Sequence, residues 1–182
     1  MFDKLNVLDE KDKRLRQKAK EVSLPLGEKD KKNIKKIIKH LTYSQIPEYE
    51  QKYNLRPGMG LAFPQLGEAK RIIVIVYEYE EGKFKNYVIV NPKIISHSEE
   101  LVALETGEGC LSVNREVEGH VPRYARITIT GFDEDGNEIK IRAREELSVA
   151  FQHEVDHLNG ILFFDRINKK KPFYNEDEIR LI

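Results

Sequence analysis

The sequence predicts an α+β fold, in which mainly antiparallel β-sheets pack around a central helix and further helices lie near the N-terminus. Three observations support this prediction. Apolar residues recur at helical spacing near both ends of the chain, and β-branched runs are grouped in the middle. Asp135-Gly136 separates two strand-like runs, as the turn of a hairpin does. Grouped strands favour an α+β domain over a doubly wound fold, in which strands and helices alternate.

The N-terminal third is predicted to be helical and charged. Leu15, Ala19 and Val22 recur at roughly helical spacing, and the segment KDKKNIKKIIKHL places isoleucine or leucine at i, i+3, i+4 and i+7. The second pattern predicts an amphipathic helix whose lysine-rich face is solvated rather than bound to an acidic partner. Residues 44–58 are polar and contain two prolines, and they are predicted to form a surface loop.

The central strands are predicted from runs rich in valine, isoleucine and threonine. These runs are residues 71–79, 87–95 and 125–132, and the hairpin segment 132–143 follows the third of them. Helical periodicity returns at Glu145, so a late helix is predicted over 145–158, with Gly160 just past its end. With 182 residues and no internal repeat, residues 1–182 are expected to form a single domain.

Composition excludes several classes of protein. Hydrophobic residues make up 40% of the chain and charged residues 34%, which favours a folded protein over a disordered one. The formal net charge is zero, so bulk electrostatic binding to nucleic acid or membrane is not indicated. The single cysteine cannot form an internal disulfide, and the N-terminus has no apolar run of signal-peptide length. A reducing, cytoplasmic location is therefore expected.

The late helix carries an H-E-x-x-H pattern formed by His153, Glu154 and His157. Helical geometry places the two imidazoles one turn apart, beside an apolar stripe, so that both can reach one ion. The carboxylate between them would be costly to bury without a role in moving a proton. The pattern therefore predicts a metal site rather than two hydrogen-bonded core histidines.

A third ligand must come from elsewhere in the chain. No histidine follows His157, and the carboxylates of residues 176–178 lie in a polar tail. Upstream, Cys110 in GEGCLSV offers a soft ligand that would complete a three-ligand site. A zinc endopeptidase, which takes its third ligand downstream, remains the less favoured alternative.

Three segments together resemble the sequence motifs of peptide deformylases. They are GMGLAFPQ (58–65), EGCLS (108–112) and QHEVDH (152–157), in the order and at spacings compatible with that family. The segment 44–58 resembles the longer loop of the Gram-positive type. The resemblance implies a hydrolase that removes the formyl group from the N-terminal methionine of newly made polypeptides and releases formate. It also makes association with the ribosome possible.

The resemblance implies roles for the residues of the site. Cys110, His153 and His157 would hold one divalent metal ion, Fe²⁺ in cells, with Zn²⁺, Ni²⁺ or Co²⁺ able to replace it. Glu154 would act as general base and then as general acid. The side-chain amide of Gln65 and the backbone N–H of Leu111 would donate hydrogen bonds to the oxyanion of the tetrahedral intermediate.

The substrate side of the site is predicted from the same resemblance. Gly58 and Gly60 would let the backbone approach an extended substrate, and Met59, Val149 and Ala150 would line the pocket for its methionine side chain. Glu108 and Arg123 form either a supporting ion pair or an ordinary surface pair.

One position departs from the family pattern, since Phe63 stands where the motif usually has alanine. Its phenyl ring either packs behind the motif or reshapes the substrate cleft. If the ring reshapes the cleft, a third hypothesis besides the deformylase and the endopeptidase follows. The chain would then be a weakly active deformylase paralogue that binds formylated N-termini.

Overall fold

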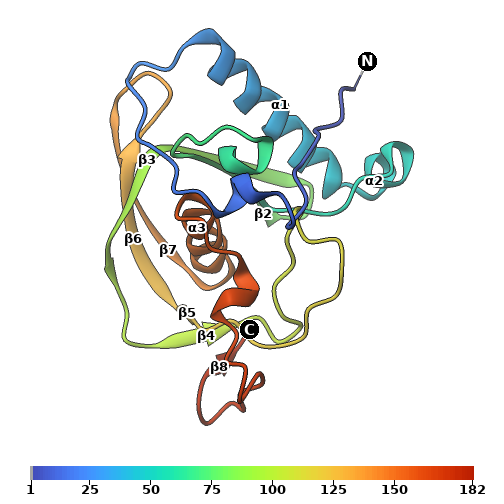
Figure 1. Cartoon of the computed structure of the whole chain (residues 1–182), viewed down its shortest axis with the longest axis vertical. Coiled ribbons are helices and arrows are strands. Elements are labelled where there is room, and N and C mark those ends of the chain that lie inside the picture. Colours follow the sequence, from blue (N-terminus) through green and yellow to red (C-terminus); the bar gives the residue numbers. More distant parts are fainter. Residues whose placement is uncertain (1) are drawn as a thin grey trace.

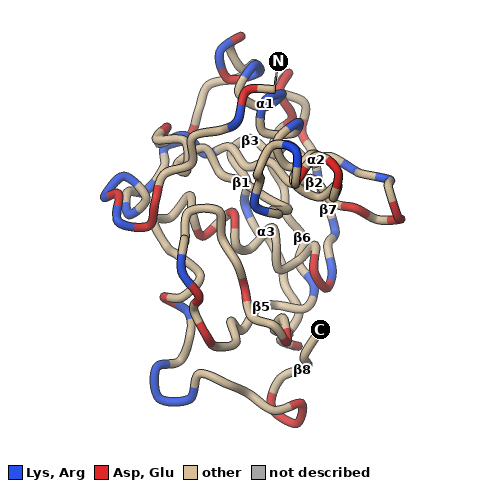
Figure 2. The backbone as a smooth tube through the Cα atoms, turned by 90° about the vertical axis from the view of Figure 1, so that its right-hand side faces the viewer, with Lys and Arg blue, Asp and Glu red and all other residues tan. Residues whose placement is uncertain are grey.

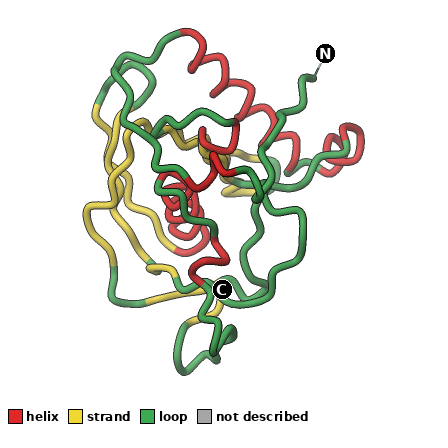
Figure 3. Tube along the Cα trace, in the orientation of Figure 1, coloured by secondary structure: helices red, strands yellow, loops and turns green. Residues whose placement is uncertain are grey.

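The computed structural model describes residues 2–182, drawn in Figures 1 and 3. The α-helices are α1 (Glu28–Ser44), α2 (Pro47–Tyr53) and α3 (Glu145–Leu158). The strands are β1 (Gly60–Ala62), β2 (Ile72–Glu80), β3 (Lys83–His97), β4 (Leu101–Ala103), β5 (Arg123–Tyr124), β6 (Arg126–Phe132), β7 (Glu138–Arg144) and β8 (Arg180–Leu181). Short 3₁₀ segments span Lys13–Arg16, Phe63–Leu66 and Phe163–Arg166.

The strands form two sheets around α3. A five-stranded antiparallel sheet has the order β1-β2-β3-β6-β7, and a three-stranded sheet has the order β5-β4-β8. Figure 1 shows α3 near the centre of the molecule with strands around it, and α1 lying across one side. The predicted α+β architecture with a central helix is confirmed.

Strand β2 explains how the sheet separates two cores. Its alternate residues Ile73 and Ile75 pack in a cluster with Phe151 and Leu158 of α3, whereas the other face of β2 packs against α1. Side chains of a strand alternate between the two faces of a sheet, so a strand covered on both faces is apolar throughout. The continuous run IIVIV in this strand is therefore buried along its whole length.

The other predicted strands and the hairpin are also confirmed. Residues 87–95 and 125–132 belong to β3 and β6, and β6 pairs with β7 across the predicted turn. In that turn Gly136 has a φ of 94°, and Asp133 Oδ1 accepts the N–H groups of Asp135 and Asn137. Asp133 thus holds the loop that Gly136 allows to close.

The prediction of a helix around Leu15, Ala19 and Val22 is wrong. Only Lys13–Arg16 forms a short 3₁₀ turn, and the chain from there to α1 is irregular, with one isolated β-bridge at Lys20. Its backbone groups bond to distant segments instead: Ala19 N–H donates to Leu158 O, and Lys20 pairs with the chain near Lys70. Leu15 and Ala19 are buried through these contacts, so their spacing reflects tertiary packing rather than a helix.

The prediction of a loop over residues 44–58 is also wrong in its centre, where α2 forms. Pro47 stands in the first turn of α2, where its missing N–H costs no hydrogen bond, so it begins the helix instead of breaking it. Asn54 ends the helix in the left-handed conformation, with a φ of 48°. Stacked aromatic rings of Tyr43 and Tyr49 fix α2 against the end of α1.

The small sheet is absent from the sequence predictions because its strands are two or three residues long and show no periodicity. Figure 2 shows basic and acidic residues on the outer segments; in the loop before β8 the basic stretch 169–171 is followed by the acidic stretch 176–178. Within residues 2–182, no helix is long and apolar enough to cross a membrane.

Candidate metal centre and active site

Helix α3 has the predicted bounds and supplies most of the polar groups of the site. Gly160, with a φ of 74°, follows its C-terminus, and a Cβ there would lie 2.5 Å from Arg16 O. Gln152 and Asp156 of this helix are polar, yet both are buried. Strands and loops surround α3, so Gln152 bonds the Tyr124 backbone, and Asp156 accepts hydrogen bonds from two arginines.

The three predicted metal ligands come together in the structure. Cys110, His153 and His157 are buried, and their donor atoms all lie within 4.8 Å of one another. The Sγ of Cys110 is 3.2 Å from Nε2 of His157. The carboxylates of residues 176–178 do not join this cluster, so the upstream cysteine is the third member, as predicted.

The chemistry of these donors fits a divalent cation. Donors bound to one ion at about 2.0–2.3 Å stand about 3.3–3.8 Å apart in a tetrahedral arrangement, close to the cysteine–histidine separation here. Burial lowers the pKa of His157 well below its ordinary value, which keeps this imidazole in the neutral form that binds a metal. A thiolate with two imidazoles suits several transition metals.

A buried ion network holds the first histidine in place. Glu108 Oε2 lies 2.8 Å from His153 Nδ1, so the other ring nitrogen, Nε2, faces the cysteine. Arg123 donates two hydrogen bonds to Glu108 and one to Asp156. Burial alone would raise the pKa of Glu108, but hydrogen bonds from His153 and Arg123 outweigh it and lower this pKa to about 2. The Glu108–Arg123 pair is therefore a buried support of the site, and not a surface pair.

Glu154 is the buried carboxylate beside the cluster. It is 4% exposed, and its Oε2 has no hydrogen-bond partner within the described part of the chain. Burial raises the pKa of Glu154 to about 7. A Cβ on Gly60 would lie 2.4 Å from Oε1 of Glu154. Gly60 is thus required by the close approach of this carboxylate, a constraint that the sequence alone did not reveal.

Gln65 is held in one orientation by its own segment. Its Oε1 accepts the Ala62 N–H at 2.8 Å, so its Nε2 donates to Ser112 Oγ at 3.1 Å and lies 3.6 Å from Cys110 Sγ. The side chain is 1% exposed. Because one end of the amide is fixed, its N–H groups point toward Ser112 and Cys110, at the wall of the cavity.

Leu111 lies in a tight turn that begins at the cysteine, which we call the 110–113 turn (residues 110–113). Val113 N–H donates to Cys110 O at 3.0 Å and closes it. Among the residues described, no protein group accepts a hydrogen bond from the Leu111 N–H. This donor is therefore available to a bound molecule.

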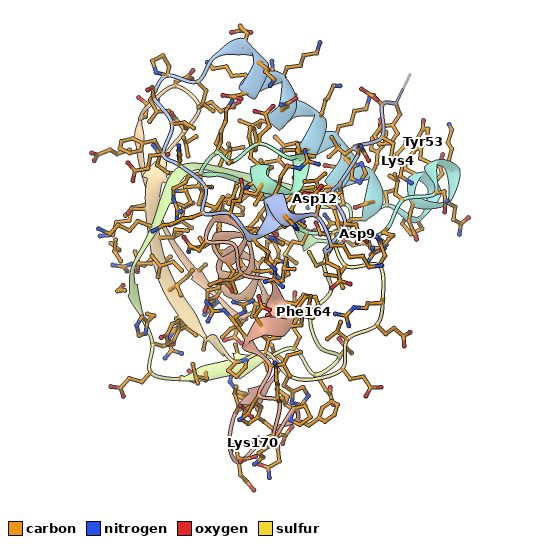
Figure 4. The ribbon with its side chains drawn as sticks, viewed as in Figure 1. Lys4, Asp9, Asp12, Tyr53, Phe164 and Lys170 are labelled. Atoms are coloured by element: carbon orange, nitrogen blue, oxygen red, sulfur yellow. The ribbon has the colours of Figure 1, made fainter. Side chains whose placement is uncertain are left out.

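The N-terminal segment ties the first two motifs together. Leu8 N–H donates to Gln65 O at 2.8 Å, and Glu10 N–H donates to Ser112 O at 2.7 Å. Asp9, labelled in Figure 4, accepts a hydrogen bond from Asn114 Nδ2. These contacts fix the position of Gln65 relative to the 110–113 turn.

All predicted site residues except His157 line one cavity of about 450 Å³. They are Gly58, Met59, Gly60, Gln65, Cys110, Leu111, Val149, Ala150, His153 and Glu154. His157 lies deeper, with 1% of its surface exposed. A larger depression of about 930 Å³, lined by Lys18, Asn91 and Lys140 among others, contains none of the metal-donor residues, so size alone does not locate the site.

Comparison with known proteins identifies the family. The family model described as polypeptide deformylase matches residues 4–173, which is nearly the whole chain. The chain belongs to the polypeptide deformylase family. Among curated relatives, peptide deformylase 2 of Bacillus cereus is 47% identical over 178 residues, covering 98% of this chain and 97% of the relative. Peptide deformylase 2 of Geobacillus stearothermophilus is 46% identical over 177 residues, covering 97% and 96%.

Solved deformylase structures share the fold. The Arabidopsis thaliana deformylase 1B, in complex with an inhibitor, has a TM-score of 0.73 and 31% identity, covering 91% of this chain and 83% of that one. The deformylase from Thermotoga maritima has a TM-score of 0.71 and 30% identity, with coverage of 91% and 99%. These matches support the resemblance found in the motifs.

Deformylases are metal-dependent hydrolases that remove the N-terminal formyl group from new polypeptides. This chain has that activity by family membership, and its Cys/His/His cluster provides the metal site that the reaction needs.

Several residues of the deformylase cavity were missed in the sequence. Leu104 and Ile182 reach it through the small sheet, and Arg56 reaches it from the end of the 44–58 segment. Leu104 and Ile182 are brought there by pairing between distant short strands, which leaves no local signal. Arg56 could have been suspected from its place two residues before the first motif.

Proposed function

We propose that Cys110, His153 and His157 together hold a single divalent cation, which is Fe²⁺ in cells and can be replaced by Zn²⁺, Ni²⁺ or Co²⁺. A cation bound there would polarise the formyl carbonyl and make hydroxide available near neutral pH. We further propose that residues 1–182 act as one catalytic unit in the cytoplasm, on formyl-methionyl chains leaving the ribosome. A reducing compartment suits a free cysteine that must stay unoxidised to bind a metal.

Glu154 moves the protons in this proposal. It takes a proton from the attacking water and returns a proton to the nitrogen of the departing amine, so that formate and a free N-terminus result. Its burial supports this role, because burial raises its pKa to about 7 and makes it both a usable base and a usable acid near neutral pH. The unpartnered Oε2 is free to accept the proton.

Two donors stabilise the oxyanion of the tetrahedral intermediate. The Gln65 amide is fixed by Ala62 and faces Cys110, and the Leu111 N–H lacks a protein acceptor among the residues described. Pre-oriented donors of this kind need no rearrangement as charge develops, and losing one typically costs about 10²–10³-fold in rate.

The substrate is proposed to bind along β1. This strand is the edge of the five-stranded sheet, so its outer backbone groups can pair with an extended peptide. The methionine side chain would enter the apolar part of the cavity, formed by Met59, Val149 and Ala150. These residues line the same cavity as Glu154 and two of the metal donors, so a methionine bound there would bring its formyl group next to them.

Gly60→Ala tests the packing of Glu154 against β1. The new Cβ would lie 2.4 Å from the carboxylate oxygen, so the flexible end of Glu154 must move, while the fold can remain. We expect kcat to fall at least about tenfold, and at most by the about 10²–10⁴-fold that a positioned proton-transfer group contributes. Gly27→Ala, where a Cβ meets nothing within 4 Å, serves as the control. Equal kcat for the two variants would contradict this reading.

Phe63→Ala tests the weakly active alternative. Phe63 is fully buried in the cluster that joins α1 to β2, and it does not line the cavity. The substitution should lower the free energy of unfolding by about 3–5 kcal/mol without raising kcat. Phe173→Ala, at a side chain that is 51% exposed and meets the His120 ring edge-on, should lower stability by less, about 0.5–1.5 kcal/mol. Urea unfolding measures the free energy of unfolding, and formate release measures kcat. A large gain in kcat for Phe63→Ala would favour the weakly active paralogue again.

The observation that carries the proposal is the convergence of the Cys/His/His donors and Glu154 on one cavity. The test is formate release from a formyl-methionyl peptide by protein purified without oxygen and analysed for its metal. We expect formate from this peptide and no cleavage of internal peptide bonds. Metal-loaded protein that releases no formate would overturn the proposed roles, and internal cleavage would instead favour the endopeptidase alternative.

A further inference from the structure

Arg56 lies in the segment 44–58, whose sequence pattern predicts a surface loop. It follows α2, on which Tyr53 is labelled in Figure 4, and it precedes Gly58 of the first motif by two residues. Leu55 beside it is buried and anchors the chain at this point. Arg56 is therefore held at the rim of the cavity, although it is itself exposed to solvent.

The guanidinium of Arg56 is engaged with the 110–113 turn. Its Nη2 donates to the carbonyls of Cys110 at 3.1 Å and Val113 at 2.9 Å. Its Nη1 donates to Asn114 Oδ1 at 2.6 Å and lies 3.5 Å from Leu111 O. The planar fork of arginine can bridge several acceptors in this way, whereas lysine presents a single point charge.

By binding the carbonyl oxygen of Cys110, Arg56 also affects the N–H of Leu111, which belongs to the same peptide group. The carbonyl of Cys110 and the N–H of Leu111 belong to one planar trans peptide, so they point in opposite directions. A group that fixes the direction of the carbonyl therefore also fixes the direction of the N–H. Val113 N–H shares this carbonyl, so Arg56 adds to a turn that is already closed. A charged donor on the carbonyl also polarises the peptide, which strengthens the N–H as a donor.

We propose that Arg56 is a positioning residue for the deformylation reaction, which orients the Leu111 N–H toward the oxyanion through the carbonyl of Cys110. The inference rests on the proposed role of Leu111. It also gives the segment before the first motif a function, because α2 and Leu55 bring the arginine to the turn that carries the cysteine ligand.

The test compares Arg56→Ala and Arg56→Lys with Arg115→Ala. Arg115 is a neighbouring arginine that pairs with Glu10 and donates to no carbonyl of the turn. For each Zn²⁺-loaded protein, the measurements are kcat and KM for formate release, bound zinc, and the amide signal of Leu111 by ¹⁵N NMR. We expect both Arg56 variants to lose about 10-fold to 100-fold in kcat, less than deleting a whole oxyanion donor costs. KM and bound zinc should stay near wild-type values, and the Leu111 amide signal should move.

Other outcomes overturn the proposal. A rise in KM alone would mean that Arg56 contacts the substrate directly, and an unmoved Leu111 signal or an unchanged kcat would mean that it does not orient the peptide. If Arg56→Ala loses zinc or does not fold, the proposal is judged on Arg56→Lys alone, from its kcat, its KM and its Leu111 amide signal. Formate release by the wild type tests the proposed function separately, since the Leu111 signal does not depend on turnover.

Discussion

Replacing Glu154 with glutamine is expected to lower kcat for formate release by about 10²–10⁴-fold while leaving the metal content unchanged. Glutamine keeps the shape of the side chain but cannot take up and return a proton. Glu154 does not belong to the donor cluster, so the metal should still bind. Steady-state kinetics and metal analysis of the same samples measure the two effects.

The matched control is Glu48→Gln, which removes a carboxylate from the exposed face of α2. It should match the wild type in both kcat and metal content. A Glu154→Gln variant that keeps wild-type kcat would contradict the assignment of Glu154 as the proton carrier. Loss of metal together with activity would show that Glu154 acts as a ligand instead.

Replacing Cys110 with serine is expected to weaken metal binding by more than about 100-fold, because even groups that only orient a ligand contribute about 10–100-fold. The serine oxygen is harder and far less acidic than the thiol, and the two histidines alone leave the site incomplete. Formate release at stoichiometric metal should then be lost. Equilibrium dialysis against Zn²⁺ measures the affinity directly.

Glu178→Gln is the counterpart variant, because an endopeptidase would draw its third ligand from this downstream region. Glu178 pairs with Lys171 in the structure and does not join the donor cluster, so metal affinity should be unchanged. The endopeptidase hypothesis would be favoured if Cys110→Ser kept its metal affinity and Glu178→Gln lost metal affinity.

The metal centre was predictable because its signals are local or chemically rare. His153 and His157 are four residues apart on a helix, so their meeting follows from helical geometry alone. Cys110 is distant in sequence, but it is the only cysteine, and metal coordination gives it a reason to lie beside the histidines. The long strands were predictable for a similar reason, since burial on both faces of β2 requires an unbroken apolar run.

The parts of the fold and the site that could not be predicted from the sequence depend on contacts between distant segments. Leu15 and Ala19 have helical spacing, yet only a 3₁₀ turn forms around Leu15, and the chain at Ala19 and the next residue bonds to Leu158 and to the segment near Lys70. Gln152 and Asp156 are polar and still buried, because Tyr124 and Arg123 satisfy them from another part of the chain. Periodicity describes one element at a time and does not reveal the partners that make a polar face compatible with burial.

The most direct test of the central claim is a titration of the metal-free protein with a divalent cation while formate release from a formyl-methionyl peptide is followed. If Cys110, His153 and His157 hold one catalytic ion, formate release should rise in proportion to added metal and level off at one equivalent per chain. Cys110→Ser should show no such rise at stoichiometric metal. Formate release that is already complete without added metal, or that rises equally in Cys110→Ser, would contradict the account.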